Sequence, residues 1–583
     1  MAPRRRLASI VILSAVWAPA GAALAQSTQA THVWQATPAT MARPTAHDHG
    51  EHVHAAAGQT EAGGTSSPND AFHNMSLKAA FPLDADTPAA SATSSDIAFW
   101  GDRAYVGNYG GFRIFDISGA TPVELADVKC DGAQGDPSVY DADGNGTADL
   151  LILSVDRTMS GPQCGAAPTA HDNPNGWEGL RIFSVEDPSN VRQIATVYQD
   201  CGSHTNTVIP RPAENRLLVL NSSYPLRPGP TCGPVRGPEA GRDPLHGVVQ
   251  VVEVPLGSPS SAREIAELPI SYPGDNDNNY LPISEHGING GAVGGSGLVD
   301  GMRACHDIAV FVEAGLVAGA CGEQGQMWRL DPLTGLPDTA NPLWVYDQDN
   351  VDFWHSASFS WDGEVVNFID ESFGDGCPTT TVKRVRLGRP ERQYQTGNMF
   401  FMNAVSGQLY SEFRIPRSSQ NPGPGGYCSS HLGNVVPAKD RYLLASAYYG
   451  AGSSIIEDTD PRAPREIAYG DREAAGTWSS YWYERNDAKK KDALDIYSND
   501  GVGTPIPGRN GFEAWTATIG AVKREGLPYL NPQTQEQLLR SQLSPDRGTG
   551  RPAIFNSGPY AEGTAPTKRP VVDLHVIDHL ATD

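Results

Sequence analysis

The chain of 583 residues is 39% hydrophobic and 19% charged, and it carries a formal net charge of −24 at pH 7. A chain this acidic repels the phosphates of nucleic acid, which argues against nucleic acid as a partner. None of the eight cysteines belongs to a CxxC pair, which argues against a zinc finger.

The N-terminus has the three parts of a secretory signal peptide. Arg4–Arg6 form a basic region, Leu7–Leu24 is apolar, and Ala23–Ala25 supply the small residues that precede cleavage. The apolar run is broken by Pro19, well short of the roughly 20 residues that span a membrane as a helix, and no later run is long enough. We therefore expect residues 1–25 to be removed, leaving a secreted protein, periplasmic or extracellular, without a transmembrane segment. In that setting the even number of cysteines indicates disulfides rather than metal thiolates.

Residues 26–75 are rich in small and polar residues and have no apolar periodicity. Such a segment buries too little surface to offset the entropy of ordering, so we predict a disordered leader. It contains four closely spaced histidines: His47, His49, His52 and His54. A flexible tract of this kind would hold a metal ion only loosely.

From residue 76 to 524 the sequence consists of short β-rich runs separated by Gly, Pro, Asn and Asp. Gly110–Ala126, Glu178–Ala195 and Ser453–Ala468 each repeat a strand, a turn marked by Gly or Pro, and a second strand. We interpret them as the outer pairs of four-stranded units. The inner pairs begin at Asp96, Pro137, His204, His306, His355, His431 and Ser479. The sequence thus predicts an all-β fold: a single seven-bladed β-propeller with four-stranded blades.

The repeated strand–Asp–turn–Pro unit resembles the LVIVD repeat of bacterial cell-surface and secreted proteins, a family thought to form propellers. The resemblance covers roughly residues 76–520. Four motifs resemble signatures of one secreted branch: Cys201–Thr205, Cys305–Ile308, Phe353–Ala357 and Thr477–Tyr483. The outer strands around Met399–Asn403 lack the Asp-x-Pro turn and depart from the pattern. The family implies a surface protein and brings no established reaction with it.

The sequence also predicts the structure at both ends of this region. Met75–Pro82 has the character of an outer strand, and we expect it to pair with residues 512–517 and close the ring, which removes an exposed edge. Residues 525–583 are expected to be a separate tail, with a helix that starts at Asn531 and runs to about Leu543 because Pro532 suits a first helical turn.

One disulfide is predicted from a hairpin. The strands around Val310 and Val317 turn near residues 313–315, which places Cys305 opposite Cys321. Directly opposed residues have Cβ atoms about 4.5–5.5 Å apart, close to the separation that a disulfide needs. The other six cysteines allow fifteen pairings, and the sequence does not choose among them.

Four histidines stand at the start of successive inner strands: His204, His306, His355 and His431. Inner strands run along the axis of a propeller, so these residues would form a ring there, and imidazoles suit iron, copper or zinc. Some propeller oxygenases hold iron with four axial histidines, which is an analogy of fold. The alternative is structural, because WD-repeat propellers use a histidine in each blade to tie a loop, and the segment 355–363 reads much like that repeat.

A second candidate site lies between two expected strands. Asp141, Asp143, Asn145 and Asp149 place side-chain oxygens at positions 1, 3, 5 and 9 of a calcium loop, and Thr147 offers its carbonyl at position 7. The twelfth residue is isoleucine rather than glutamate, which excludes an EF-hand and suggests a loop like those of integrin-type propellers. The alternative is an ordinary turn rich in Asn, Asp and Gly.

These observations support two functions. The first is an extracellular or cell-surface binding module whose ligand, a protein or a small molecule, is not specified by the sequence. The second is a metalloenzyme, resembling an oxidoreductase, with its metal held by the four histidines. The metal content of the purified protein would distinguish them.

Overall fold

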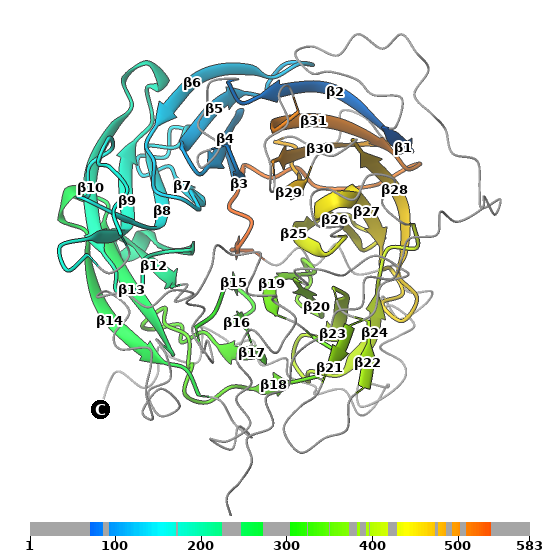
Figure 1. Ribbon diagram of the computed structural model, residues 1–583. Coiled ribbons are helices and arrows are strands. Elements are labelled where there is room, and N and C mark those ends of the chain that lie inside the picture. The colour runs from blue at the N-terminus through cyan, green and yellow to red at the C-terminus, as the bar shows by residue number, and fades with distance from the viewer. Residues whose placement is uncertain are drawn as a thin grey trace, which may run out of the picture. The chain divides into compact units, whose positions relative to one another are not determined.

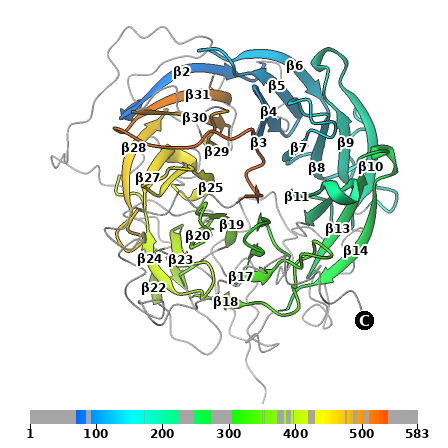
Figure 2. The same ribbon diagram turned by 180° about the vertical axis from the view of Figure 1, so that it is seen from behind.

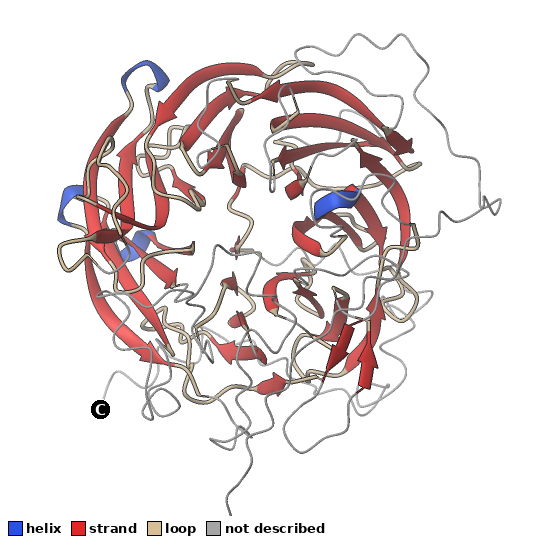
Figure 3. Cartoon of the chain, viewed as in Figure 1, coloured by secondary structure: helices blue, strands red, loops and turns tan. Residues whose placement is uncertain are grey.

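The computed structural model describes residues 70–537 except for fourteen gaps. These are 85–91, 171–172, 224–246, 272–303, 323, 349, 352, 372–381, 385–391, 396, 418–427, 473–475, 486–491 and 502–508. The predicted signal peptide, nearly all of the leader and the C-terminal 46 residues therefore lie outside the described part. Figure 3 shows strands throughout, with a few single turns of 3₁₀-helix. No helix in the described part is long and apolar enough to cross a membrane.

Strands that follow one another in sequence pair side by side and antiparallel. The first sheet contains β3 (Ser94–Trp100), β4 (Arg103–Asn108), β5 (Gly111–Asp116) and β6 (Val123–Lys129). The next contains β7 (Pro137–Tyr140), β8 (Leu150–Met159), β9 (Trp177–Ser184) and β10 (Arg192–Tyr198), followed by β11 (Thr205–Arg211), β12 (Arg216–Ser222), β13 (Val248–Pro255) and β14 (Arg263–Pro269). Then come β15 (Asp307–Phe311), β16 (Leu316–Cys321), β17 (Gln324–Arg329) and β18 (Trp344–Tyr346), and after them β19 (Trp354–Phe359), β20 (Val365–Asp370), β23 (Met399–Asn403) and β24 (Leu409–Phe413).

Two further groups are joined into one nine-stranded sheet. They are β25 (Ser430–Val435), β26 (Leu443–Tyr448), β27 (Gly452–Glu457) and β28 (Arg465–Asp471), and β29 (Thr477–Trp482), β30 (Ala493–Asp500) and β31 (Gly511–Thr518). A short parallel contact between β25 and β29 links them. A separate hairpin is made of β21 (Val382–Arg384) and β22 (Arg392–Tyr394).

The sheets succeed one another around a common axis, with the first strand of each nearest the centre and the last at the rim (Figure 1). This is the architecture of a β-propeller. Burial follows the same gradient, since every residue of β3 is buried while β6 and β14 at the rim alternate between exposed and half-buried residues. Each sheet buries its two faces against its neighbours in the ring.

The repeated glycine at the start of a third strand has a backbone reason. Gly111 and Gly179 have φ of 138° and 139°, a conformation that L side chains rarely adopt. A Cβ atom at Gly111 would lie 2.0 Å from the carbonyl oxygen of Val128, and one at Gly179 would lie 2.2 Å from that of Val197. The glycines let the outermost strand lie close to the third strand, which explains why the glycine recurs in the sequence repeat.

The predicted closure by the N-terminal strand is confirmed. β2 (Met75–Pro82) pairs antiparallel with β31, from Met75 opposite Ala517 to Pro82 opposite Gly511. The propeller includes residues before the predicted boundary at 76, because β1 (Ala71–His73) pairs with β28. There Phe72 packs edge-on against Trp515, with ring centroids 5.4 Å apart.

The predicted C-terminal helix is wrong for residues 531–537, and the tail is not separate from the propeller. β32 (Tyr529–Leu530) pairs with the end of β3, and β33 (Thr534–Gln535) pairs in parallel with β15. The orange segment in Figures 1 and 2 runs inward to the axis. Its polar groups bind inner strands: the side chain of Asn531 bonds both backbone groups of Val139, at 2.8 and 2.9 Å. These long-range bonds outweigh the local preference for a helix.

The predicted Cys305–Cys321 disulfide is present, at the open end of the β15–β16 hairpin. A second disulfide, which the sequence did not specify, joins Cys130 to Cys164. The described part contains no free cysteine. The disulfides are consistent with an oxidising compartment.

We expect one buried carboxyl group to make stability depend on pH. Asp458 is 3% exposed and pairs with no Lys or Arg among the described residues, and burial raises its pKa to about 8. Its protonated form is favoured by folding, so its stabilising contribution is present below about pH 4 and is lost as the pH rises through about 8. A tenfold change in proton affinity corresponds to about 1.4 kcal/mol. The free energy of unfolding of Asp458→Asn should therefore rise by several kcal/mol relative to that of the wild type between about pH 4 and about pH 8. Thermal unfolding of both proteins across the range measures this, and parallel curves would contradict it.

Candidate metal centre

The four predicted histidines gather at one end of the axis. His204 and His306 directly precede β11 and β15, and His355 and His431 are the second residues of β19 and β25. Because the inner strands run in the same sense, all four imidazoles lie at the same end. Ring centroids are 4.4 Å apart for His204 and His306, 3.6 Å for His306 and His355, and 4.1 Å for His355 and His431. The structure therefore brings all four rings into one contiguous cluster.

The cluster is buried, and burial disfavours the charged form of three of its imidazoles. The exposed fractions are 5% for His204, 2% for His306 and 0% for His355 and His431. Burial, with a smaller contribution from neighbouring imidazoles, holds the pKa of His306 and of His355 well below the usual value. Burial lowers the pKa of His431 to about 3. Neutral imidazoles keep a lone pair, which is the state that binds metals.

Three of the rings have their Nδ1 atoms held by acceptors. His306 Nδ1 donates to the carbonyl of His355 at 3.1 Å, and His431 Nδ1 donates to the carbonyl of Trp478 at 2.5 Å. His204 Nδ1 lies 2.6 Å from a carboxylate oxygen of Asp156. These contacts fix the tautomer and leave the lone pair on Nε2, as in most metal-bound histidines. The first two run to the inner strand of the next group of strands around the axis, β19 for His306 and β29 for His431, unlike the WD-repeat arrangement.

Glu371 joins the cluster, and the sequence did not reveal it. It directly follows β20, in the same sheet as His355, and its carboxylate lies 3.4 Å from His355 Nε2 and 3.9 Å from His431 Nε2. One ligand atom each of His306, His355 and Glu371 lie within 4.8 Å of one another. The Tyr449 hydroxyl donates to Glu371, and burial raises the pKa of this carboxyl to about 8. No sequence motif marks Glu371, because only the pairing of β19 with β20 carries it to the axis.

Several ring nitrogens have no hydrogen-bond partner in the described part of the chain. These are both nitrogens of His355 and Nε2 of His431. Buried polar atoms in proteins are nearly always satisfied, which makes these nitrogens candidate ligand atoms. Aromatic rings border the same atoms: Phe353 lies 5.6 Å from His306, and Tyr449 and Trp478 lie 4.5 and 4.8 Å from His431. The nitrogen-rich donor set with one carboxylate suits late first-row metals and not calcium.

The predicted calcium loop lies between β7 and β8, at the opposite end of the inner strands. The structure brings carboxylate oxygens of Asp141, Asp143 and Asp149 within 4.8 Å of one another. Asp141 accepts bonds from the backbone of residues 144, 145 and 146, and Asp149 accepts two from residues 142 and 143. The side-chain oxygen of Asn145 accepts from the Thr147 N–H at 2.8 Å, and its side-chain nitrogen donates to Glu186 outside the loop at 3.1 Å. The loop is thus ordered by its own hydrogen bonds.

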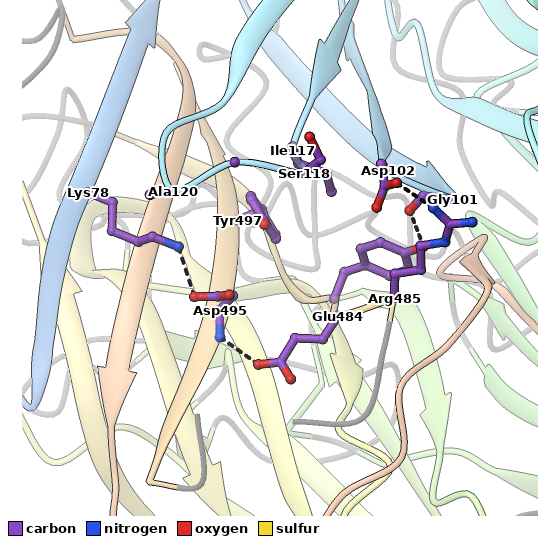
Figure 4. A pocket seen from close by; sticks show the side chains of 12 residues that line it. Lys78, Gly101, Asp102, Ile117, Ser118, Ala120, Glu484, Arg485, Asp495 and Tyr497 are labelled. Atoms are coloured by element: carbon purple, nitrogen blue, oxygen red, sulfur yellow. Dashed lines mark hydrogen bonds and ion pairs between the residues drawn. The ribbon is translucent and has the colours of Figure 1, made fainter. Parts of the chain in front are cut away.

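A cavity of about 230 Å³ opens where the first and last sheets meet (Figure 4). Lys78 pairs with Asp495 at 2.8 Å across its floor, and Arg485 pairs with Asp102 at its rim. The cavity lies beside the turn after β3 and the end of β29, away from the histidines, which precede or begin their strands. Because its charged side chains already pair with one another, the axial cluster is the stronger candidate site.

No family model and no curated protein matches this chain. Among solved structures it is similar to Sqt1 from Saccharomyces cerevisiae, with a TM-score of 0.41 and 8% identity over 76% of this chain and 100% of that one. BamB from Moraxella catarrhalis gives a TM-score of 0.35 and 11% identity over 76% of this chain and 99% of the other. The periplasmic gluconolactonase PpgL from Pseudomonas aeruginosa gives 0.40 and 11% over 75% and 100%. The propeller architecture of this chain follows from its own sheets.

Proposed function

We propose that this protein is an exported β-propeller that binds a late first-row transition metal on its axis. The ligands would be His204, His306, His355, His431 and Glu371. The observation that carries the proposal is a buried cluster of four imidazoles beside a carboxyl group. An acceptor holds Nδ1 of His204, His306 and His431, and Nε2 of His355 and of His431 lies near Glu371. Ligand atoms of three of these residues, His306, His355 and Glu371, lie within 4.8 Å of one another, and the rings of His204 and His431 adjoin them.

We further propose that the propeller has seven blades. Five separate sheets supply one blade each, and the nine-stranded sheet supplies two, with β2 as the fourth strand of the last. The LVIVD resemblance and the predicted signal peptide support an exported protein of the cell surface or periplasm, and the disulfides agree with it.

The metal would supply Lewis acidity or one-electron chemistry, and the chain's residues would place it. Tyr449 orients Glu371, and Asp156 fixes the ring of His204. The rings of Phe353 and Trp478, which pack beside His306 and His431, would keep bulk water from the ion. This combination favours the metalloenzyme over the metal-free binding module, which requires neither unpaired imidazole nitrogens nor an adjacent buried carboxylate.

The test is the metal content of the full mature chain. Protein stripped with a chelator and reloaded separately with iron, copper and zinc should retain one tightly held ion per chain after dialysis. His355→Ala and Glu371→Gln should each lower retention at least tenfold, and Asp156→Asn should lower metal affinity about 10–100-fold. Two controls should retain the metal: His73→Ala, which alters a partly exposed histidine stacked on Tyr469, and a variant with alanine at the four leader histidines.

Two results would overturn the proposal. The stripped wild type could bind none of the three metals, or His355→Ala could retain as much metal as the controls. Either result would leave the binding module, with the histidines serving to tie one sheet to the next.

We also propose that Asp141, Asp143 and Asp149 hold calcium in the loop between β7 and β8. The convergence of three carboxylates supports it, because like charges so close repel one another unless a cation lies among them. Calcium titration of Asp143→Ala should then show one site fewer than the wild type.

A further inference from the structure

A group of buried carboxylates lies on the axis next to the histidines. Asp96 is in β3, Asp136 directly precedes β7, and Asp307 is the first residue of β15, directly after His306. Their exposed fractions are 1%, 0% and 2%. The side chains of Asp96 and Asp136 are within hydrogen-bonding reach of each other, and Asp307 is close enough to act electrostatically on both. Three inner strands thus direct acidic groups to one region.

No Lys or Arg in the described part of the chain compensates this group. The bonds that the three carboxyl groups accept come from neutral groups, among them the backbone N–H groups of residues 97, 206 and 308 and the Gln533 amide. Burial raises the pKa of Asp96 to about 6, and burial together with the charge of Asp96 raises that of Asp136 well above its usual value. Burying charge without a partner is strongly unfavourable, so the group must hold either protons or a cation.

Unpartnered amide oxygens favour a cation. The Gln533 Nε2 atom donates to Asp96 at 2.7 Å, and the Asn206 Nδ2 atom donates to Asp136 at 3.2 Å, so each amide contacts a carboxyl group through its nitrogen. Their oxygens, Gln533 Oε1 and Asn206 Oδ1, make no hydrogen bond in the described part of the chain, and neither does Asp136 Oδ1. Gln533 is 3% exposed and Asn206 is 0% exposed. A hard cation binds carboxylate and amide oxygens alike, so one ion beside these residues would account for both the uncompensated carboxyl groups and the unpartnered oxygens.

We propose that Asp96, Asp136, Asn206 and Gln533 bind a calcium-like hard cation on the axis, at a site separate from the histidine cluster. The donors are all oxygens, which hard cations prefer, while the histidine cluster offers mainly nitrogens. Asp307, the first residue of β15, lies nearby and is not one of the proposed ligands. Because Gln533 belongs to the C-terminal segment, the cation also fastens that segment to the inner strands.

Calcium binding to the full mature chain tests this, with EGTA-treated protein titrated by calorimetry. The background is Asp143→Ala, in which the loop between β7 and β8 has lost a carboxylate. This background should bind one calcium per chain, and adding Asp136→Asn should weaken that binding at least 100-fold. Gln533→Leu, which keeps every carboxylate, should weaken it at least tenfold and guards against a folding defect in the first variant.

Thermal unfolding provides the matched comparison. Calcium should raise the unfolding midpoint of the background protein, and Asp136→Asn should remove that increment while raising the midpoint of calcium-free protein. Asp458→Asn also removes a buried carboxyl group, but one away from the axis, and should leave the calcium increment intact. Absence of calcium binding in the background protein, or an unchanged increment in Asp136→Asn, would overturn the site and leave protonated carboxyl groups.

The two metal proposals fail independently. Treating the protein with EGTA, removing the chelator by dialysis and then adding back zinc alone loads the histidine cluster without calcium, so the transition-metal content can be measured in the same calcium-free samples. Asp136→Asn should leave that content unchanged. A protein without a transition metal that still binds calcium on the axis would sustain this inference alone.

Discussion

Deleting the N-terminal strand is expected to unfold the propeller rather than merely shorten it. A mature chain that starts at residue 70 should keep its thermal midpoint, whereas one that starts at residue 83 should lose more than about 5 kcal/mol, comparable with the whole stability of an ordinary domain. The reason is that β2 is the last partner of β31 and closes the ring. Without it, β31 becomes an open edge that invites aggregation.

The packing of β2 supports this magnitude. Ala79 and Ala80 are buried, and the Phe81 ring lies 5.1 Å from Phe115 of the first sheet and 6.1 Å from Phe512 of β31. Arg113 also donates to the Phe81 carbonyl at 2.8 Å. The strand thus bridges the first and last sheets, and its loss separates them.

Urea unfolding and light scattering measure the effect. A synthetic peptide of residues 70–84 added to the shorter chain should restore part of the lost stability, since it supplies the same strand in trans. If the chain starting at residue 83 unfolds at the same urea concentration as the longer one, the closure contributes no stability and the prediction is wrong.

Replacing Arg472 with methionine should destabilise the protein by about 3–5 kcal/mol, the usual result of breaking a buried ion pair. Arg472 pairs with Glu513 of β31, and their side chains are 0% and 1% exposed. The variant leaves Glu513 buried beside Asp500, another buried carboxyl group, whose pKa is raised well above its usual value by burial and by the charge of Glu513. Two acidic groups would then remain without their cation.

A double variant separates the ion pair from general packing. Arg472→Met combined with Glu513→Gln removes both charges and should be markedly more stable than Arg472→Met alone, because neutral replacement of a buried pair is often tolerated. Arg485→Met breaks a pair with Asp102 whose members are 44% and 43% exposed, and it should change stability by less than about 1 kcal/mol. If the double variant loses as much stability as the two single variants lose together, the broken ion pair is not the cause of the loss in Arg472→Met.

The sequence by itself determined the strands, their grouping and two long-range contacts. Short β-rich runs between turn residues predicted an all-β ring, since side-chain alternation and turn chemistry are local properties. The solitary strand Met75–Pro82 and the spacing of Cys305 and Cys321 across one hairpin predicted pairings that the structure contains. The four histidines could be placed together because each holds the same position at the start of an inner strand.

Only the tertiary structure decided which other groups meet on the axis. Glu371 reaches the histidines through the pairing of β20 with β19, and Asp156 reaches His204 from another sheet. Gln533 lies beside Asp96 although 437 positions separate them, because the C-terminal segment bonds to inner strands instead of forming the helix that its local sequence favours. A local pattern carries no information about such partners. Their contacts depend on the closed ring, which brings inner strands from distant parts of the sequence together around the axis.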